Sequence, residues 1–158
     1  PLIITAAGMF FFYARINLVY SFTGIILAHV ALATPFVVIT VTATLVGFDM
    51  NMVKASQSLG ARPVRTFFKV IMPLILPGVI SGALFAFITS FDEVVIVMFM
   101  ASLDQLTIPK QMWAGIRQEI SPVILCMATC LVVLSILLLT TVELLRRRSE
   151  KLRGITSR

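Results

Sequence analysis

The chain has 158 residues, of which 59% are hydrophobic and 13% are charged, and its formal net charge is +6. Soluble chains carry about 25% charged residues, and a domain of this size cannot bury so much apolar surface, so the composition excludes a soluble domain and indicates an integral membrane protein. A basic chain can bind nucleic acid, but here the basic residues lie beside apolar segments, where the positive-inside rule explains them more simply.

The first apolar segment, from Pro1 to about Val19, is marginal as a full membrane span. It begins in the middle of hydrophobic sequence, without an initiator Met or a signal peptide, so we expect the true N-terminus to lie upstream. Arg15 marks either a pore position or, as we favour, a side chain that reaches the lipid headgroups.

The second apolar segment, Thr23 to Val46, has 24 residues and contains no Asp, Glu, Lys or Arg. A helix of this length rises about 36 Å, which is enough to span a bilayer with some tilt. Pro35 predicts a kink that the hydroxyl of Thr34 can relieve. For His29 we favour a hydrogen-bonded interior residue over a contact with a substrate.

A basic stretch, residues 49–73, separates the second and third apolar segments and must therefore lie in water. It predicts a short helix over residues 50–59 with Asp49 as its N-cap. Gly60 can adopt a positive φ and end that helix, and Pro63 suits the first turn of a second helix.

The second helix of this stretch has one apolar face, at spacings i, i+3, i+4 and i+7. This face fits a groove on a partner protein, but it also fits a helix that lies on lipid headgroups, and periodicity alone does not decide between them. The apolar face comprises Val64, Phe67, Phe68 and Ile71, and the basic residues mostly off it are Arg62, Arg65 and Lys69.

The third apolar segment is expected to run from about Leu76 to Met100. Gly78 and Gly82 form a G-x-x-x-G pattern, which Ala86 extends, and small residues let helices approach closely inside lipid. We expect this ridge to pack against the chain's own helices, with a dimer face as the alternative.

Asp92 and Glu93 are predicted to lie within this third segment, beyond the membrane midplane on the side away from the basic stretch. An ionised carboxylate inside a membrane costs about 2.5 kcal/mol or more, so such residues are usually functional or paired. Two interpretations remain open for the acidic pair and for Ser90, which lies two positions before Asp92. One is contact with a cation in transit; the other is neutralisation by a partner helix or a position at the outer interface.

The loop at residues 101–121 has no net charge and is predicted to contain a short interfacial helix over residues 110–119, anchored by Trp113. Pro122 then opens a fourth span, Val123 to Leu145. Two cysteines one helical turn apart in that span are expected to be packing residues rather than a disulfide or a metal pair; they are Cys126 and Cys130.

Ten of the thirteen basic residues lie in the central stretch and in the C-terminal tail, residues 146–158. The positive-inside rule therefore places both in the cytosol, and the two spans between them agree with this topology. The sequence has no G-x-x-x-x-G-K-[ST] phosphate loop and no spacing typical of a nucleophilic triad or a metal site, so it predicts neither an enzyme nor a metalloprotein.

The central stretch resembles the cytoplasmic EAA loop of ABC-importer permeases, the inner-membrane components of binding-protein-dependent transport systems. That family has E-A-A, three residues, Gly, nine residues and then I-x-L-P. The sequence SFDEVV, residues 90–95, resembles the acidic motif of spermidine/putrescine-type permeases within the same family. In the central stretch the matching positions are Ala55, Gly60, Val70, Met72 and Pro73, and the departures are Lys54 for Glu and Ser56 for the second Ala.

The resemblance implies an all-α, polytopic helical bundle of the type I ABC importer permease fold, with about four of about six transmembrane helices present. It further implies one permease domain over residues 1–158, N-terminally incomplete, with a coupling loop at 49–73 whose second short helix sits in a cleft of an ATPase subunit. The residues implied for ATPase coupling are Lys54, Ala55, Ser56, Gly60, Pro63, Val64, Phe67, Phe68 and Pro73, and those implied for the substrate pathway are Ser90, Asp92 and Glu93.

The resemblance also implies the surroundings of the chain. It would lie in the bacterial inner membrane with its C-terminus in the cytoplasm, among lipids, a second and different permease chain, ATPase subunits and an external substrate-binding protein. It would bind no cofactor, since the partner subunit binds ATP, and it would carry a small organic solute such as putrescine or spermidine. The alternatives are a secondary transporter or channel driven by an ion gradient, and an anchoring subunit without a pathway.

Overall fold

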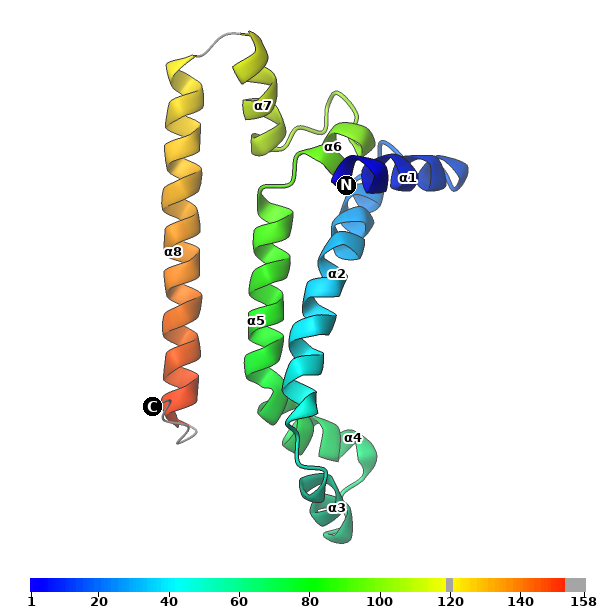
Figure 1. The fold of residues 1–158 in the computed structure, drawn as a ribbon, viewed down its shortest axis with the longest axis vertical. Coiled ribbons are helices and arrows are strands. Elements are labelled where there is room, and N and C mark those ends of the chain that lie inside the picture. The colour runs from blue at the N-terminus through cyan, green and yellow to red at the C-terminus, as the bar shows by residue number, and fades with distance from the viewer. Residues whose placement is uncertain (119–120, 153–158) are drawn as a thin grey trace. The chain divides into compact units, whose positions relative to one another are not determined.

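The computed structural model describes residues 1–118 and 121–152, and these residues form helices joined by short loops, without a strand among them (Figure 1). The elements are α1 (Leu2–Arg15), α2 (Phe22–Val46), α3 (Asn51–Ser58), α4 (Pro63–Thr66), the π-helical turn η1 (Phe67–Ile71), α5 (Met72–Phe91), α6 (Val95–Met100), α7 (Ile108–Gln118) and α8 (Pro122–Leu152).

Three helical stretches in the described part of the chain are long and apolar enough to cross a membrane: Phe22–Val46, Pro63–Phe91 and Pro122–Thr141. The helix α1 has 14 residues and rises only about 21 Å, which is short of the hydrocarbon thickness of about 30 Å. The all-α membrane fold is confirmed, with three membrane-length helices where about four spans were expected.

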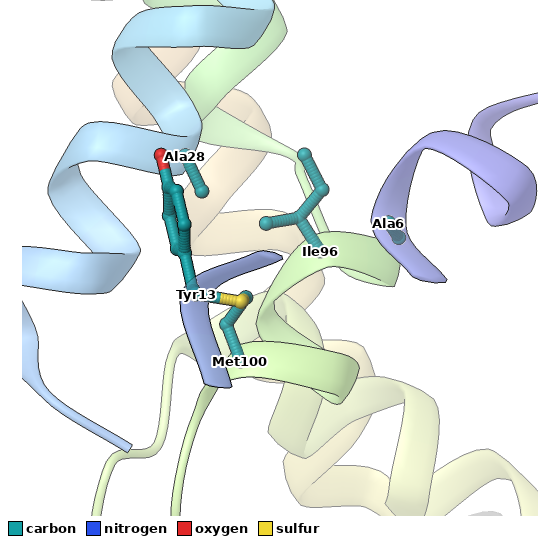
Figure 2. Packing of buried hydrophobic residues seen from close by; sticks show 5 residues of the cluster. All are labelled: Ala6, Tyr13, Ala28, Ile96 and Met100. Carbon is teal, nitrogen blue, oxygen red and sulfur yellow. The ribbon is translucent and has the colours of Figure 1, made fainter. Parts of the chain in front are cut away.

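The chain divides into two compact units, which we describe separately: Pro1–Leu32 with Ile88–Arg158, and Ala33–Phe87. The core of the first unit is a small cluster in which α6 packs against α1 (Figure 2). The amide of Tyr20 donates a hydrogen bond of 2.9 Å to the Met100 carbonyl, which fixes the end of α6. The cluster residues are Ala6, Tyr13, Ala28, Ile96 and Met100.

In the second unit, α2 and α5 lie side by side (Figure 1) and meet at the small-residue ridge. A Cβ built on Gly82 would lie 2.5 Å from Thr40 Oγ1 and 3.0 Å from Val37 Cα, and one built on Gly78 would overlap the Thr44 side chain. The close approach therefore requires glycine at both positions. The expectation that this ridge packs against the chain's own helices is confirmed.

The C-terminal elements depart modestly from the predicted bounds. The interfacial helix begins at Ile108, two residues earlier than expected, and Glu119 lies outside the described residues. The fourth span continues as one helix through Leu152, so the first half of the predicted basic tail is helical, while residues 153–158 lie outside the described part. No residue in the spanning window of α8 is buried within the described structure, so this surface is available to lipid or to another chain.

Candidate functional site

The central stretch, residues 49–73, folds into a helical elbow: α3, a tight turn, and the start of the next helix. The helix α3 begins at Asn51, whose amide donates a hydrogen bond of 2.9 Å to Asp49 Oδ1, although the N-cap is Met50 rather than the predicted Asp49. A carboxylate at this end also suits the helix dipole. The predicted start of the helix is thus displaced by one residue.

Gly60 ends α3 as predicted, because its φ is +78°. Its amide donates to the Gln57 carbonyl at 2.9 Å, and the Ala61 amide donates to the Ser56 carbonyl at 3.1 Å. These two bonds form a Schellman motif, which satisfies the last carbonyls of the helix and turns the chain. The turn is therefore specified by one residue that tolerates the left-handed conformation.

Pro63 is the first residue of α4, as predicted, and Arg62 before it is extended with φ −70° and ψ 153°. A residue before proline prefers this conformation, and proline suits the first helical position because no amide hydrogen is needed there. Together, Gly60 and Pro63 determine where one helix ends and the next begins.

Ser56 and Thr66 hold the two arms of the elbow together. Their hydroxyl oxygens lie 2.9 Å apart, and Thr66 is only 2% exposed. Ser56 is the position at which the sequence departs from the second alanine of the family pattern, and the hydrogen bond gives that departure a structural role. No feature of the sequence predicts the pairing with Thr66, since the two residues lie on different helices.

The second arm of the elbow is not the separate short helix that was predicted. The segments α4, η1 and α5 form one continuous helical stretch from Pro63 to Phe91. Pro73 and Pro77 lie in it without ending it, because inside a membrane-spanning helix a local π adjustment can satisfy the backbone groups that a proline frees. Here the π turn, Phe67–Ile71, ends two residues before Pro73.

The second arm presents apolar side chains to the surroundings. Val64 is 70% exposed and Phe68 62% exposed, and the Phe67 and Phe68 rings pack edge to face with centroids 5.1 Å apart. The predicted apolar face is therefore present and unburied within the chain. An open hollow of about 610 Å³ lies between the two arms; its walls include Met52, Ala55 and Leu59 on one side and Arg65 and Lys69 on the other.

The acidic pair does not lie inside a membrane helix, which corrects the prediction of a third segment running on to Met100. The helix α5 ends at Phe91, and α6 begins at Val95. Glu93 is 7% exposed, and its Oε1 accepts a hydrogen bond of 2.8 Å from the Ile96 amide. The N-cap of α6 is Val94, so Glu93 lies one residue before the cap, and its side chain satisfies a backbone donor of the first turn and interacts favourably with the helix dipole.

The three residues predicted for a substrate pathway therefore have different surroundings. Asp92 is exposed, whereas the Glu93 side chain accepts a hydrogen bond from the first turn of α6. Ser90 Oγ lies 2.7 Å from His29 Nδ1, and His29 Nε2 is buried without a hydrogen-bond partner among the described residues. His29 is thus a hydrogen-bonded residue, as favoured from the sequence, but its partner, 61 positions away, was not predicted.

The two cysteines of α8 are free and exposed, so the packing role expected of them is not fulfilled within the described chain. In that part of the chain no group of three or more His, Cys, Asp and Glu side chains could hold a metal ion. The described residues therefore offer two separate candidate sites: the elbow, in the second unit, and the acidic break after Phe91, in the first unit.

These features define a class: a multi-pass helical membrane protein with an exposed, basic helical elbow between two of its spans. The model of the family described as binding-protein-dependent transport system inner membrane component matches residues 1–151. The chain belongs to this family, and the resemblance seen in its central stretch is confirmed.

The names of similar proteins indicate which subgroup of the family the chain resembles. The chain is 32% identical over 150 residues to the spermidine/putrescine transport system permease protein PotC of Haemophilus influenzae, an alignment that covers 95% of this chain and 58% of that protein. It is 30% identical over 151 residues to Escherichia coli PotC (96% and 57% covered), and 35% identical over 103 residues to the E. coli putrescine transport system permease protein PotI (65% and 37%). The chain spans a little over half the length of the PotC relatives. These relatives are named as transport permeases.

Proposed function

We propose that the chain is a permease subunit of an ATP-driven importer of polyamines such as putrescine or spermidine, in the bacterial inner membrane with its C-terminus in the cytoplasm. The observation that carries this proposal is the elbow. It has the helix–Gly–helix–Pro layout of the family, and it presents two adjacent phenylalanines that the chain does not bury. The chain contains no phosphate loop, so ATP would be bound by a partner ATPase subunit.

In this proposal the elbow is the docking surface for the ATPase. Phe67 and Phe68 would fill an apolar groove on the partner, as exposed aromatic anchors do in other interfaces. Arg65 and Lys69 would attract acidic side chains at its rim. Within the elbow, α3 and α4 would move as one body, because the Schellman turn and the Ser56–Thr66 hydrogen bond fix them to each other.

The motion would reach the membrane through α5, which continues from the elbow without a break. Its 20 residues rise about 30 Å, which is about the thickness of the hydrocarbon core. Asp92, directly after its end, would therefore lie near the opposite interface from the elbow. An exposed carboxylate there would attract a polycation entering from outside, which agrees with the substrates named for the PotC relatives.

The remaining partners follow from the same proposal. The unburied apolar surface of α8 would contact lipid and a second permease chain of different sequence. The loop beyond the acidic break would face an external substrate-binding protein. The second permease chain and the binding protein would complete the translocation pathway.

The test is uptake of labelled putrescine into proteoliposomes that contain the assembled complex and the loaded binding protein. We expect uptake to require ATP inside the vesicles and to survive an uncoupler. A secondary transporter would show the reverse. Phe67→Asp should abolish co-purification of the ATPase and reduce uptake, whereas Leu103→Asp, at an apolar residue 91% exposed in another loop, should leave co-purification intact. Normal uptake by Phe67→Asp would contradict the docking role.

A further inference from the structure

His29 lies in the second turn of α2, and only one of its two ring nitrogens has a partner. Nδ1 lies 2.7 Å from Ser90 Oγ, in the last turn of α5, and both residues belong to the first unit. Nε2 is buried, with no hydrogen-bond partner among residues 1–118 and 121–152. Leaving a buried polar atom unpaired is unfavourable, and most strongly so at membrane depth. The ring therefore has an unused hydrogen-bonding nitrogen, which a partner from outside the described chain can reach in a conformation that exposes Nε2.

The chemistry around the ring limits what that partner is. The Glu93 carboxylate lies within electrostatic range of the imidazole, and Asp92 directly precedes Glu93, so an anion would be repelled. A metal ion needs more ligands, and the described residues offer no group of three. A cation that brings its own hydrogen-bond donors, such as an ammonium group, suits a neutral nitrogen beside carboxylates.

The direction of the Ser90 hydrogen bond is linked to the tautomer of the ring, and so to whether Nε2 can accept a hydrogen bond. A serine hydroxyl can donate or accept, and a neutral imidazole carries its proton on one nitrogen only. When Nδ1–H donates to Ser90 Oγ, the proton is on Nδ1 and Nε2 presents a lone pair. This tautomer is the one complementary to an ammonium N–H.

We propose that His29, oriented by Ser90, is a cargo-binding residue of the translocation pathway, and that its neutral Nε2 accepts a hydrogen bond from an ammonium group of a polyamine. This inference rests on the proposed function and adds to it a residue that neither the family pattern nor the acidic motif contains. Ser90 is then a positioning residue, which acts through the imidazole.

The first test reads the tautomer directly. The permease is labelled with ¹⁵N-histidine and reconstituted with its unlabelled partners in nanodiscs, and the His29 signals are assigned by their loss in His29→Gln. We expect a protonated Nδ1 and an unprotonated Nε2, and a shift of the Nε2 resonance when putrescine is added but not when sodium chloride of equal ionic strength is added. A protonated Nε2, or an Nε2 resonance that putrescine leaves unchanged, would overturn the proposal.

The second test measures transport at a fixed concentration of loaded binding protein. His29→Leu should lower putrescine uptake about tenfold, the effect of losing one hydrogen bond to a charged group. Ser90→Ala should lower it by less, and His29→Gln, which keeps a polar group, should retain more uptake than His29→Leu. Thr129→Ala is the matched control, because it also removes a hydroxyl from a spanning helix, where Oγ1 donates to the Leu125 carbonyl of the same helix; it should leave uptake unchanged.

The outcomes separate this inference from the proposed function. A wild-type complex that imports no putrescine would refute the polyamine assignment itself. A wild-type complex that imports putrescine, with a His29→Leu variant that imports it equally well, would refute only the role of His29. Loss of assembly in both His29→Leu and His29→Gln would show a structural role and would also overturn the inference.

Discussion

The adjacent acids Asp92 and Glu93 should respond differently to substitution, because the structure gives them different surroundings. Glu93 is 7% exposed and bonds to the first turn of α6, while Asp92 is exposed. We expect Glu93→Ala to destabilise the protein and Asp92→Asn to reduce polyamine uptake with little change in stability.

The loss of stability expected for Glu93→Ala follows from the hydrogen bond between the Glu93 side chain and the Ile96 amide. In the wild-type protein the Ile96 amide donates to Glu93 Oε1 at 2.8 Å, and Ile96 is itself 0% exposed. Removing the Glu93 side chain leaves this buried amide unpaired. An unsatisfied buried donor costs about 1–3 kcal/mol. Glu93→Gln keeps an acceptor oxygen and loses only the charge–dipole interaction, about 0.3–1 kcal/mol.

The assay pairs unfolding of the purified permease in detergent with putrescine uptake per assembled complex. We expect the unfolding midpoint of Asp92→Asn to be close to that of the wild type, that of Glu93→Gln to be lower, and that of Glu93→Ala to be the lowest. Asp104→Asn, which neutralises another exposed acid, controls for the loss of surface charge and should leave the unfolding midpoint unchanged. Equal midpoints for Glu93→Ala and Asp92→Asn would refute the argument from this hydrogen bond, and normal uptake by Asp92→Asn would remove that residue from the pathway.

Three further sets of substitutions test the geometry of the second unit. Gly82→Leu should destabilise the contact of α2 with α5 by about 1–3 kcal/mol, the usual cost of overpacking, while Ala83→Leu on an exposed position of the same helix should not; equal unfolding midpoints for the two variants would contradict the close approach. Gly60→Ala should cost about 1–2 kcal/mol from the left-handed backbone alone, since a Cβ there meets no atom within 4 Å. Gly60→Asn should cost less, and an unchanged Gly60→Ala variant would refute the positive φ. Ser56→Ala and Thr66→Val should each lower stability, and the double variant should lose less than the sum; strict additivity would show that the hydroxyls do not interact.

The turn of the elbow could be predicted from sequence because its causes are local. Gly60 and Pro63 act through their own backbone preferences, which are independent of the rest of the chain. The small-residue ridge at Gly78 and Gly82 was predictable for a related reason, since a spacing of four places both on one helix face. The spacing did not identify the α2 residues that face this ridge.

The break after Phe91 was missed although a local signal exists. Glu93 stands two positions before the apolar run that forms α6, and an acid in that place is typical of a helix start. The signal was outweighed by the length of the apolar segment, which suggested one continuous span. The opposite error occurred near Pro73, where the second helix of the basic stretch was expected to end, because proline usually ends a helix; a π turn lies just before this proline and the helix continues. The His29–Ser90 pair was beyond local reasoning, because residues 61 positions apart meet only through the packing of two helices.

The continuity of the stretch from Pro63 to Phe91 changes how the proposed coupling would work. A separate docking helix would transmit force through a loop, whereas here the second arm of the elbow is the end of a membrane span. Helices bend where a π turn or a proline interrupts the regular ladder, so the compliant region is the one from Phe67 to Pro77. The Ser56–Thr66 hydrogen bond lies just before that region, which joins α3 and α4 into one body on the docking side. A force on α3 or α4 would therefore bend the span in the region from Phe67 to Pro77. Phe67 and Phe68, at the start of that region, would move with it.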